Sequence, residues 1–158
     1  MTVTVTRDES KRIISAIEGM AKARLLVGIP GEKSGRKGGA IGNAQLGYIH
    51  EKGSPAQNIP ARPFLVPGVR AVAGKCADVL KAYAAKAVAG GATIDRGLNA
   101  AGLIAQAAVK RRIVSQEGFT PLMASTIAAR KRAGKHGEKA LIRTGQLLNS
   151  ISYVIKRK

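Results

Sequence analysis

The segment Asn58–Leu65, with the sequence NIPARPFL, constrains the fold of this chain more than any other. Pro60 and Pro63 fix two backbone φ angles, remove two amide donors and push the residue before each of them away from helix. A stiff, extended connector therefore carries Phe64 to the start of the next helix. Because the connector offers no nucleophile, metal ligand or phosphate-binding loop, it indicates a chain that assembles rather than one that catalyses.

Composition predicts a single domain over residues 1–158 with an aliphatic core. The chain is 45% hydrophobic, which is enough for one modest core. Its only cysteine, Cys76, excludes an internal disulfide. The longest uncharged stretch, 97–109, is too short to span a bilayer, and the first residues lack a secretion-signal pattern. We therefore expect a soluble protein of a reducing cytoplasm with no membrane partner.

The charge is strongly positive and unevenly distributed. Lysine and arginine number 27 against 9 aspartate and glutamate, a net +18. Residues 110–158 hold 12 basic and 2 acidic side chains, so this last third carries +10 of the total. Such a surface attracts polyanions, either nucleic acid or an acidic protein face. The alternative is a solvated basic exterior that only keeps the protein soluble.

The hydrophobic pattern predicts an α+β fold with a small mixed or antiparallel sheet. Strands are expected near 2–6, 23–29 and 151–155. Apolar residues at helical spacing predict two long helices, over about 65–88 and 93–114. Small residues dominate the apolar side of the second, which allows close approach to a neighbour. We expect these helices to pack on one face of the sheet.

Shorter helices are expected near the N-terminus, over about 43–51 and after residue 120. The first begins near Asp8 and presents Ile17 on its apolar face. The last has Thr120 as its capping residue and Pro121 at its first helical position, and it continues to about residue 132.

The sequence contains no residue pattern that is typical of a catalytic site. His50 and Glu51 could be taken for a general base and its carboxylate, but adjacent residues of a helix point in different directions. The glycines between 28 and 42 lack the spacing of a phosphate-binding loop. Cys76 falls on the apolar side of its predicted helix. We therefore expect no enzyme activity, no cofactor and no metal site.

Non-specific nucleic-acid binding is the alternative function. The charge favours it, but the RNP aromatic motif, zinc-finger spacing and basic-zipper pattern are absent. Stacking on bases needs exposed aromatic rings. Phe64, Tyr83 and Tyr153 are instead expected on apolar faces or at helix starts. Non-specific contact of lysine and arginine side chains with phosphate groups is therefore the form of nucleic-acid binding that the sequence still allows.

Four segments occur in an order that resembles a known family. They are GYIHEKG at 47–53, IPARPFL at 59–65, the stretch 118–132 with FTPL and RKR, and ALIRTGQLLNSISY at 140–153. In order and spacing they resemble the virion-morphogenesis, or tail-completion, proteins of long-tailed bacteriophages. In that family the corresponding motifs read hEfG, iPaRPFl, PL…T…R and Li.TG.L..Si.

The resemblance covers roughly residues 43–155, and it has two departures. Lys52 stands where an aromatic residue is usual, and Phe119 stands where some relatives carry tryptophan. These differences bear on the subfamily more than on the family.

The resemblance implies a structural protein of the neck, at the junction between the DNA-filled head and the tail. Such a protein is located in the virion, and in the host cytoplasm during assembly. It would form a closed ring around the DNA channel, a hexamer or a dodecamer with the hexamer favoured. Its other partners would be head-connector and tail-tube proteins and the double-stranded DNA in the channel. The ring could close the end of the tail tube or sit between connector and tail.

The resemblance also implies roles for particular residues. A structural clasp that orients the long helix would consist of Pro60, Arg62, Pro63 and Phe64, with a simple interhelix loop as the alternative. The last helix and strand would be positioned by Leu141, Thr144, Gly145 and Leu147. Of these, Thr144 is expected to act as a helix cap rather than as a contact residue.

Two glycine- and lysine-rich segments, near 31–41 and 131–139, are predicted to be mobile basic loops. Together with the basic end of the preceding helix, they are the candidates for docking on neighbouring rings or for facing DNA. The basic residues concerned are Lys33, Arg36, Lys37, Arg130, Lys131, Arg132, Lys135 and Lys139.

Overall fold

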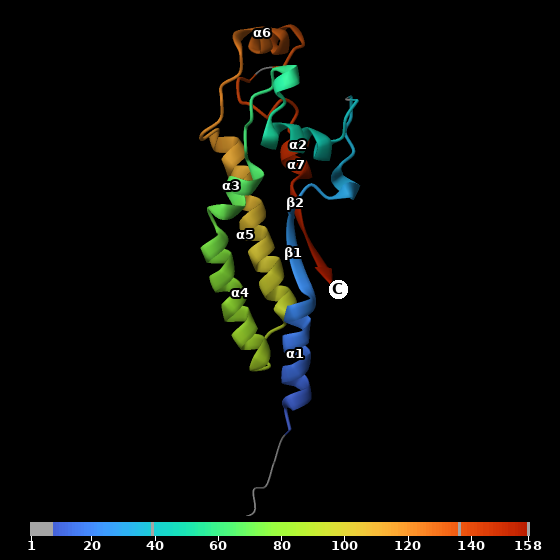
Figure 1. Cartoon of the computed structure of the whole chain (residues 1–158), viewed down its shortest axis with the longest axis vertical. Coiled ribbons are helices and arrows are strands. Elements are labelled where there is room, and N and C mark those ends of the chain that lie inside the picture. The colour runs from blue at the N-terminus through green and yellow to red at the C-terminus, as the bar shows by residue number, and fades with distance from the viewer. Residues whose placement is uncertain (1–7, 39, 136, 158) are drawn as a thin grey trace, which may run out of the picture.

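A computed structural model describes residues 8–38, 40–135 and 137–157, and within them the fold is α+β (Figure 1). The strand predicted near 2–6 lies outside the described residues. Along the chain the elements are α1 (Ser10–Lys22), β1 (Ala23–Gly28), the 3-10 turn η1 (Gly31–Lys33), α2 (Asn43–Lys52), the 3-10 turn η2 (Pro55–Gln57), α3 (Leu65–Arg70), α4 (Ala73–Val88), α5 (Ile94–Ser115), α6 (Ala124–Arg132), α7 (Gln146–Ser150) and β2 (Ser152–Arg157).

The strands predicted near 23–29 and 151–155 are confirmed, and they pair antiparallel as β1 and β2. Val27 lies opposite Tyr153 on the face that packs against α5. The outer face carries Leu26 opposite Val154, with no helix against it (Figure 1). The sheet thus joins a segment near the start of the chain to its last strand.

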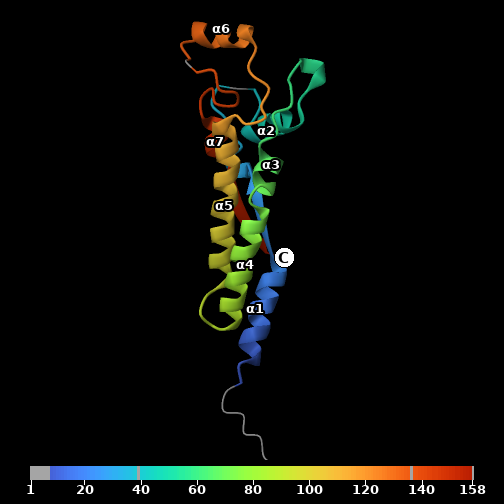
Figure 2. The same ribbon diagram turned by 90° about the vertical axis from the view of Figure 1, so that its left-hand side faces the viewer.

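The two long helices are also confirmed, although the first starts at Ala73 rather than near residue 65. Val72, with φ −121° and ψ 8°, leaves the helical region and separates α3 from α4. Helix α5 lies between α4 and the sheet and contacts both (Figure 1), and the view turned by 90° shows α4 and α5 running side by side (Figure 2). The molecule is long because α1 extends beyond this layer at one end and α6 lies at the other.

Small residues on α5 allow two elements to approach it closely, as the sequence predicts, and a glycine on α3 allows the approach of a third. A Cβ atom built at Gly97 would lie 2.5 Å from Tyr83 Cβ on α4, and one at Gly102 would lie 2.4 Å from Tyr153 Cδ2 on β2. At Gly68 on α3, a Cβ atom would lie 2.8 Å from Val109 Cα. The atom that a Cβ at Gly68 would meet belongs to the backbone of Val109, which cannot move aside by changing its rotamer. Gly68 therefore determines how closely α3 packs on α5.

We therefore expect Gly68→Ala to lower the free energy of unfolding by about 1–3 kcal/mol, because the added methyl group must push two helices apart. Gly74→Ala, on the open surface of α4, is the matched control, since nothing lies within 4 Å of its added Cβ. It should raise stability by about 0.5–1 kcal/mol through helix propensity alone. Urea unfolding followed by circular dichroism measures both. Equal shifts in the two variants would contradict the close packing.

Two predictions of helix starts were wrong. Helix α6 begins at Ala124, and residues 120–123 precede it in non-helical conformation, although Thr120 and Pro121 have the pattern of a helix start. Helix α7 begins at Gln146, and Gly145, with φ 72°, occupies the capping position in place of Thr144. The first difference arises from a long-range contact of Arg62 with the carbonyl oxygens of residues 120 and 121.

Candidate functional site

Two residues of α2 hold the middle of the connector and the start of α3. The Arg62 amide donates to the carbonyl oxygen of His50 at 2.7 Å. The Glu51 carboxylate accepts from the amides of Phe64 at 2.7 Å, Leu65 at 2.8 Å and Val66 at 2.9 Å. The first amides of a helix have no partner within the helix, so Glu51 supplies the cap that α3 lacks.

Arg62 links the connector to the segment before α6. Its side chain is 5% exposed, and it donates from Nε to Thr120 O at 2.7 Å and from Nη2 to Pro121 O at 3.1 Å. These bonds hold residues 120 and 121 away from helical geometry, which explains why α6 starts late. Burial lowers the pKa of Arg62, and nearby Arg130 lowers it further.

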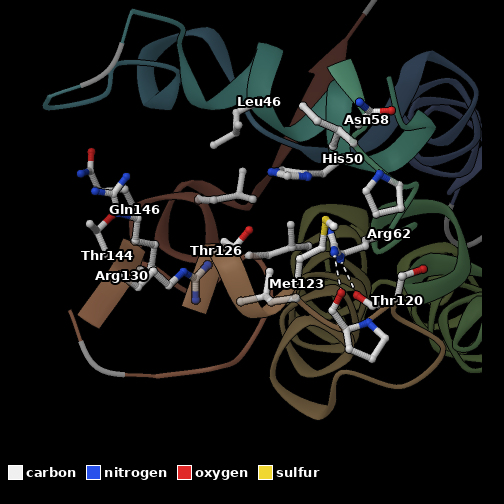
Figure 3. Close-up of a pocket in the computed structure, with 18 of the residues that line it drawn as sticks. Leu46, His50, Asn58, Arg62, Thr120, Met123, Thr126, Arg130, Thr144 and Gln146 are labelled. Carbon is white, nitrogen blue, oxygen red and sulfur yellow. Dashed lines mark hydrogen bonds between the residues drawn. The ribbon is translucent and has the colours of Figure 1, made fainter. Parts of the chain in front are cut away.

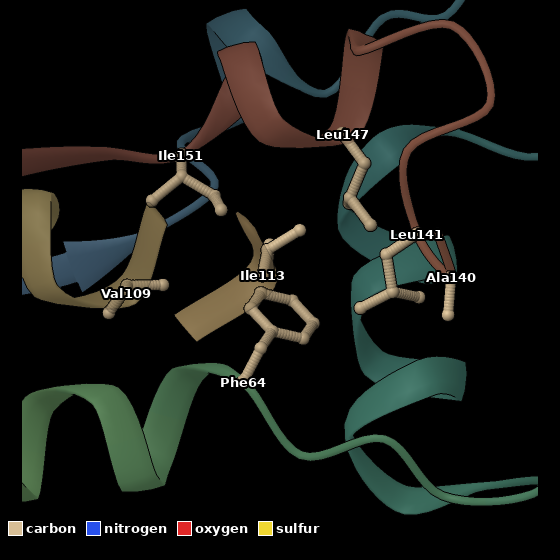
Figure 4. Packing of buried hydrophobic residues seen from close by; sticks show 7 residues of the cluster. All are labelled: Phe64, Val109, Ile113, Ala140, Leu141, Leu147 and Ile151. Carbon is tan, nitrogen blue, oxygen red and sulfur yellow. The ribbon is translucent and has the colours of Figure 1, made fainter. Parts of the chain in front are cut away.

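Phe64 is 2% exposed and joins the connector to the C-terminal motif (Figure 4). Leu141 and Leu147 belong to the same buried cluster, together with residues of α5. The complete cluster is Phe64, Val109, Ile113, Ala140, Leu141, Leu147 and Ile151. Arg112 on α5 adds a bond from Nε to Pro63 O at 3.1 Å.

The structure thus brings together all four segments that carry the family resemblance. Glu51 comes from the first segment, Arg62 and Phe64 from the second, the carbonyls of 120–121 from the third, and Leu141 and Leu147 from the fourth. We call this set of contacts the junction. Arg62 and Phe64 of the clasp predicted from the sequence take part in the junction, and the role of the clasp in orienting the long helix stays a prediction.

A pocket of about 450 Å³ opens beside the junction, between α2, the connector, α6 and the start of α7 (Figure 3). Half of the predicted site residues line it, although they come from three separate predicted groups. These are Arg36, Pro60, Arg62, Arg130, Leu141, Thr144, Gly145 and Leu147. Thr144, which does not cap α7, contributes its exposed side chain to this lining.

The other basic candidates do not line this pocket. Lys33 Nζ donates to Ser152 Oγ at 3.2 Å, and Lys139 Nζ donates to Val114 O at 2.9 Å. The backbone amide of Lys37 donates to Gln146 Oε1 at 2.9 Å. The side chains of the remaining three are exposed on or just after α6: Lys131, Arg132 and Lys135.

The lining of the pocket is basic and contains no aspartate or glutamate. Arg143, which sequence reasoning did not single out, joins Arg36, Arg62 and Arg130 there. Burial lowers the pKa of Arg130, and the positive charge of Arg143 lowers it further. The guanidinium groups therefore repel one another without a carboxylate in the lining to balance them. We call this site the arginine pocket.

His50 also lines the arginine pocket, and its environment keeps it neutral at pH 7. Burial, with added repulsion from Arg62 and Arg36, lowers the pKa of His50 to about 4. Its Nδ1 atom is buried and has no hydrogen bond to any described residue. Glu51 is committed to the amides of α3, so the two neighbours do not form a catalytic pair.

The low pKa of His50 predicts a pH-dependent stability. Its folded pKa lies below the unfolded value of about 6.5, so this contribution is complete above pH 6.5 and is lost as the pH falls toward 4. Between pH 7 and 5 the free energy of unfolding should fall by at most about 2 kcal/mol. The observed fall should be smaller, because His50 is only partly buried and solvent screens its interactions. His50→Gln should remove this part of the pH dependence. Urea titrations at each pH measure it; parallel pH profiles for the two proteins would contradict it.

Sequence reasoning missed Glu51 as a cap and Arg143 as a pocket residue. Glu51 lies well before Phe64 in the sequence, so local capping rules do not find it. Arg143 lies inside the ALIRTG stretch that carries the family resemblance. Its place in that motif is the sequence feature that could have indicated a role for it.

Few of the described residues have side chains arranged for metal binding or nucleophilic catalysis. They contain no cluster of three or more histidine, cysteine, aspartate or glutamate side chains that could hold a metal ion. Burial raises the pKa of the Cys76 thiol, whose Sγ lies 3.6 Å from Ala101 O. None of the helices described is both long and apolar enough to cross a membrane.

No family model, curated protein or solved structure matches this chain. The resemblance to tail-completion proteins therefore stays a prediction, and the function is argued below from the residues and their arrangement.

Proposed function

We propose that this chain is a structural protein of the bacteriophage neck that forms a ring at the head–tail junction and has no catalytic activity. The observation that carries the proposal is the junction. Four segments that resemble motifs of tail-completion proteins, and that are scattered along the sequence, meet in one set of contacts. This convergence is expected if the four motifs form one structural unit, and it supports the proposal in that sense.

A ring subunit needs two different surfaces that complement each other, because the contact between neighbours in a ring is heterologous. Helix α1 and the outer face of the sheet supply one candidate surface. None of the residues of α1 is buried; Ile14 is 55% exposed and Ile17 is 51% exposed. Leu26 on the outer face of the sheet is 45% exposed. We infer that a neighbouring subunit covers this apolar surface.

The opposite end of the molecule is suited to contacts with other parts of the neck. There α2, α6 and the arginine pocket lie together, far from α1 (Figure 1). The exposed basic side chains on and after α6 can contact the phosphates of DNA in the channel or an acidic face of a head-connector or tail-tube protein. The proposed location is the virion neck.

The subunit contact can be tested on purified protein. Native mass spectrometry and negative-stain images should show a closed ring, a hexamer or a dodecamer. Ile17→Asp should break the ring into monomers, because it places a charge in the apolar contact. Ser15→Asp adds the same charge at another exposed position of α1 and should leave the ring intact. A wild-type chain that stays monomeric at every concentration, alone and with the proteins of the neck, would contradict the proposal.

A further inference from the structure

We propose that the arginine pocket is a docking site for an acidic segment of a partner protein, which inserts a carboxylate between Arg36, Arg130 and Arg143 and an apolar side chain against the apolar part of the pocket wall. The binding chemistry stands on the geometry of the pocket. Only the identification of the partner as a neighbouring protein of the neck rests on the proposed function.

The first argument is the unbalanced charge. Four guanidinium groups line the pocket without a single carboxylate in the lining. Arg62 already uses its Nε and Nη2 donors in hydrogen bonds to the carbonyl oxygens of residues 120 and 121. An anion brought to the other three groups would relieve their mutual repulsion, and the interaction is strong where water is partly excluded.

The second argument is that donors remain available. Each guanidinium has five N–H donors in a planar fork that matches a carboxylate. Among the described residues, Arg36 bonds only through Nη1, to Asn43 Oδ1 at 3.2 Å. Arg130 likewise uses Nη1, for the carbonyls of Gly137 and Lys139 at 3.1 and 2.9 Å. Arg143 is exposed at the rim, where it can turn toward a ligand.

Apolar side chains make up much of the remaining wall of the pocket, which favours a peptide over a nucleic acid. Leu46 and Met123 lie on opposite sides of the hollow (Figure 3), and Met123 is 69% exposed. A volume of about 450 Å³ falls within the range of pockets that enclose small ligands or side chains. The phosphates of a duplex lie on a convex rod and would leave such a wall uncovered, whereas an acidic peptide with a leucine beside its carboxylate would fill it.

The probe for a test is a fluorescein-labelled nine-residue peptide composed of aspartate, glutamate and two leucines. Its control has asparagine and glutamine in place of the acids. Binding is followed by fluorescence anisotropy at 150 mM salt and by NMR shift mapping on the full chain. The acidic peptide should move the signals of His50, Thr126 and Thr144, all of which line the pocket, and the control peptide should not.

Charge reversal separates the pocket from the general positive field. Arg143→Glu should weaken binding of the acidic peptide by about tenfold or more. Arg111→Glu, which makes the same change in net charge on the exposed surface of α5, should weaken it by less than about twofold, because surface charges are screened. Thermal melts of both variants establish that they are folded.

Three results would overturn the inference: an equal loss of affinity in both variants, shifts confined to residues outside the pocket, or no shifts at any peptide concentration. A 12-base-pair duplex provides the competing source of anions. If it moves the same pocket signals and binds more tightly than the acidic peptide, the site is a phosphate site and the inference is wrong. If the chain forms a ring but does not bind the peptide, only this inference is contradicted. If it binds the peptide but stays a monomer under all conditions, only the proposed function is contradicted.

Discussion

Phe64→Ala is expected to lower the free energy of unfolding by about 3–5 kcal/mol, the usual range for deleting a buried aromatic ring. Phe64 is 2% exposed and lies in the cluster that includes Ile113 of α5 and Leu147 of α7. These neighbours come from distant parts of the chain, and the connector holds Phe64 at a fixed place. The surrounding elements therefore have little freedom to close the cavity.

Urea unfolding followed by far-ultraviolet circular dichroism measures this loss. Tyr48→Ala is the matched control, because it also removes an aromatic ring, but from a side chain that is 69% exposed. Its cost should be within about 0.5 kcal/mol of zero. If the two variants lost equal stability, Phe64 would not anchor the connector to the core.

Arg62→Ala is expected to lower the free energy of unfolding by about 2–4 kcal/mol, because it removes two hydrogen bonds that the buried guanidinium donates to carbonyl acceptors. These acceptors are Thr120 O and Pro121 O. Arg62→Lys should lose an intermediate amount, since an ammonium group cannot reproduce the planar fork. Arg111→Ala, at an exposed position of α5, is the control and should change stability by less than about 0.5 kcal/mol.

Hydrogen exchange adds a local measurement to the Arg62 prediction. Loss of the bonds should raise the exchange of amides in residues 118–123 before those of α5. A neutral effect of Arg62→Ala would mean that burying the cation costs as much as its hydrogen bonds return. In that case the connector would be an ordinary loop and not a clasp.

The local parts of the fold were predictable from the sequence. Pro60 and Pro63 act on their own neighbours, so an extended connector that ends at a helix start follows from backbone chemistry alone. The small residues of α5 likewise predict close approach, because the absence of a large side chain is visible in the sequence. The two strands of the sheet follow from β-branched and apolar runs.

The parts that failed depend on contacts between distant residues. Thr120 and Pro121 have the pattern of a helix start, but Arg62 binds their carbonyls and delays α6 to Ala124. In the same way, the residues of the arginine pocket are ordinary surface arginines in sequence. Their grouping without a carboxylate appears only when α2, α6 and the start of α7 are placed together.

Electron microscopy of particles made without this chain tests the proposed function most directly. In the phage that the proposal implies, the gene for this chain is interrupted, and the products of infection are imaged in negative stain. We expect filled heads beside unattached tails, with joining restored when the wild-type chain is supplied in trans. Complete, infectious particles produced in the absence of the chain would contradict its role as a neck protein.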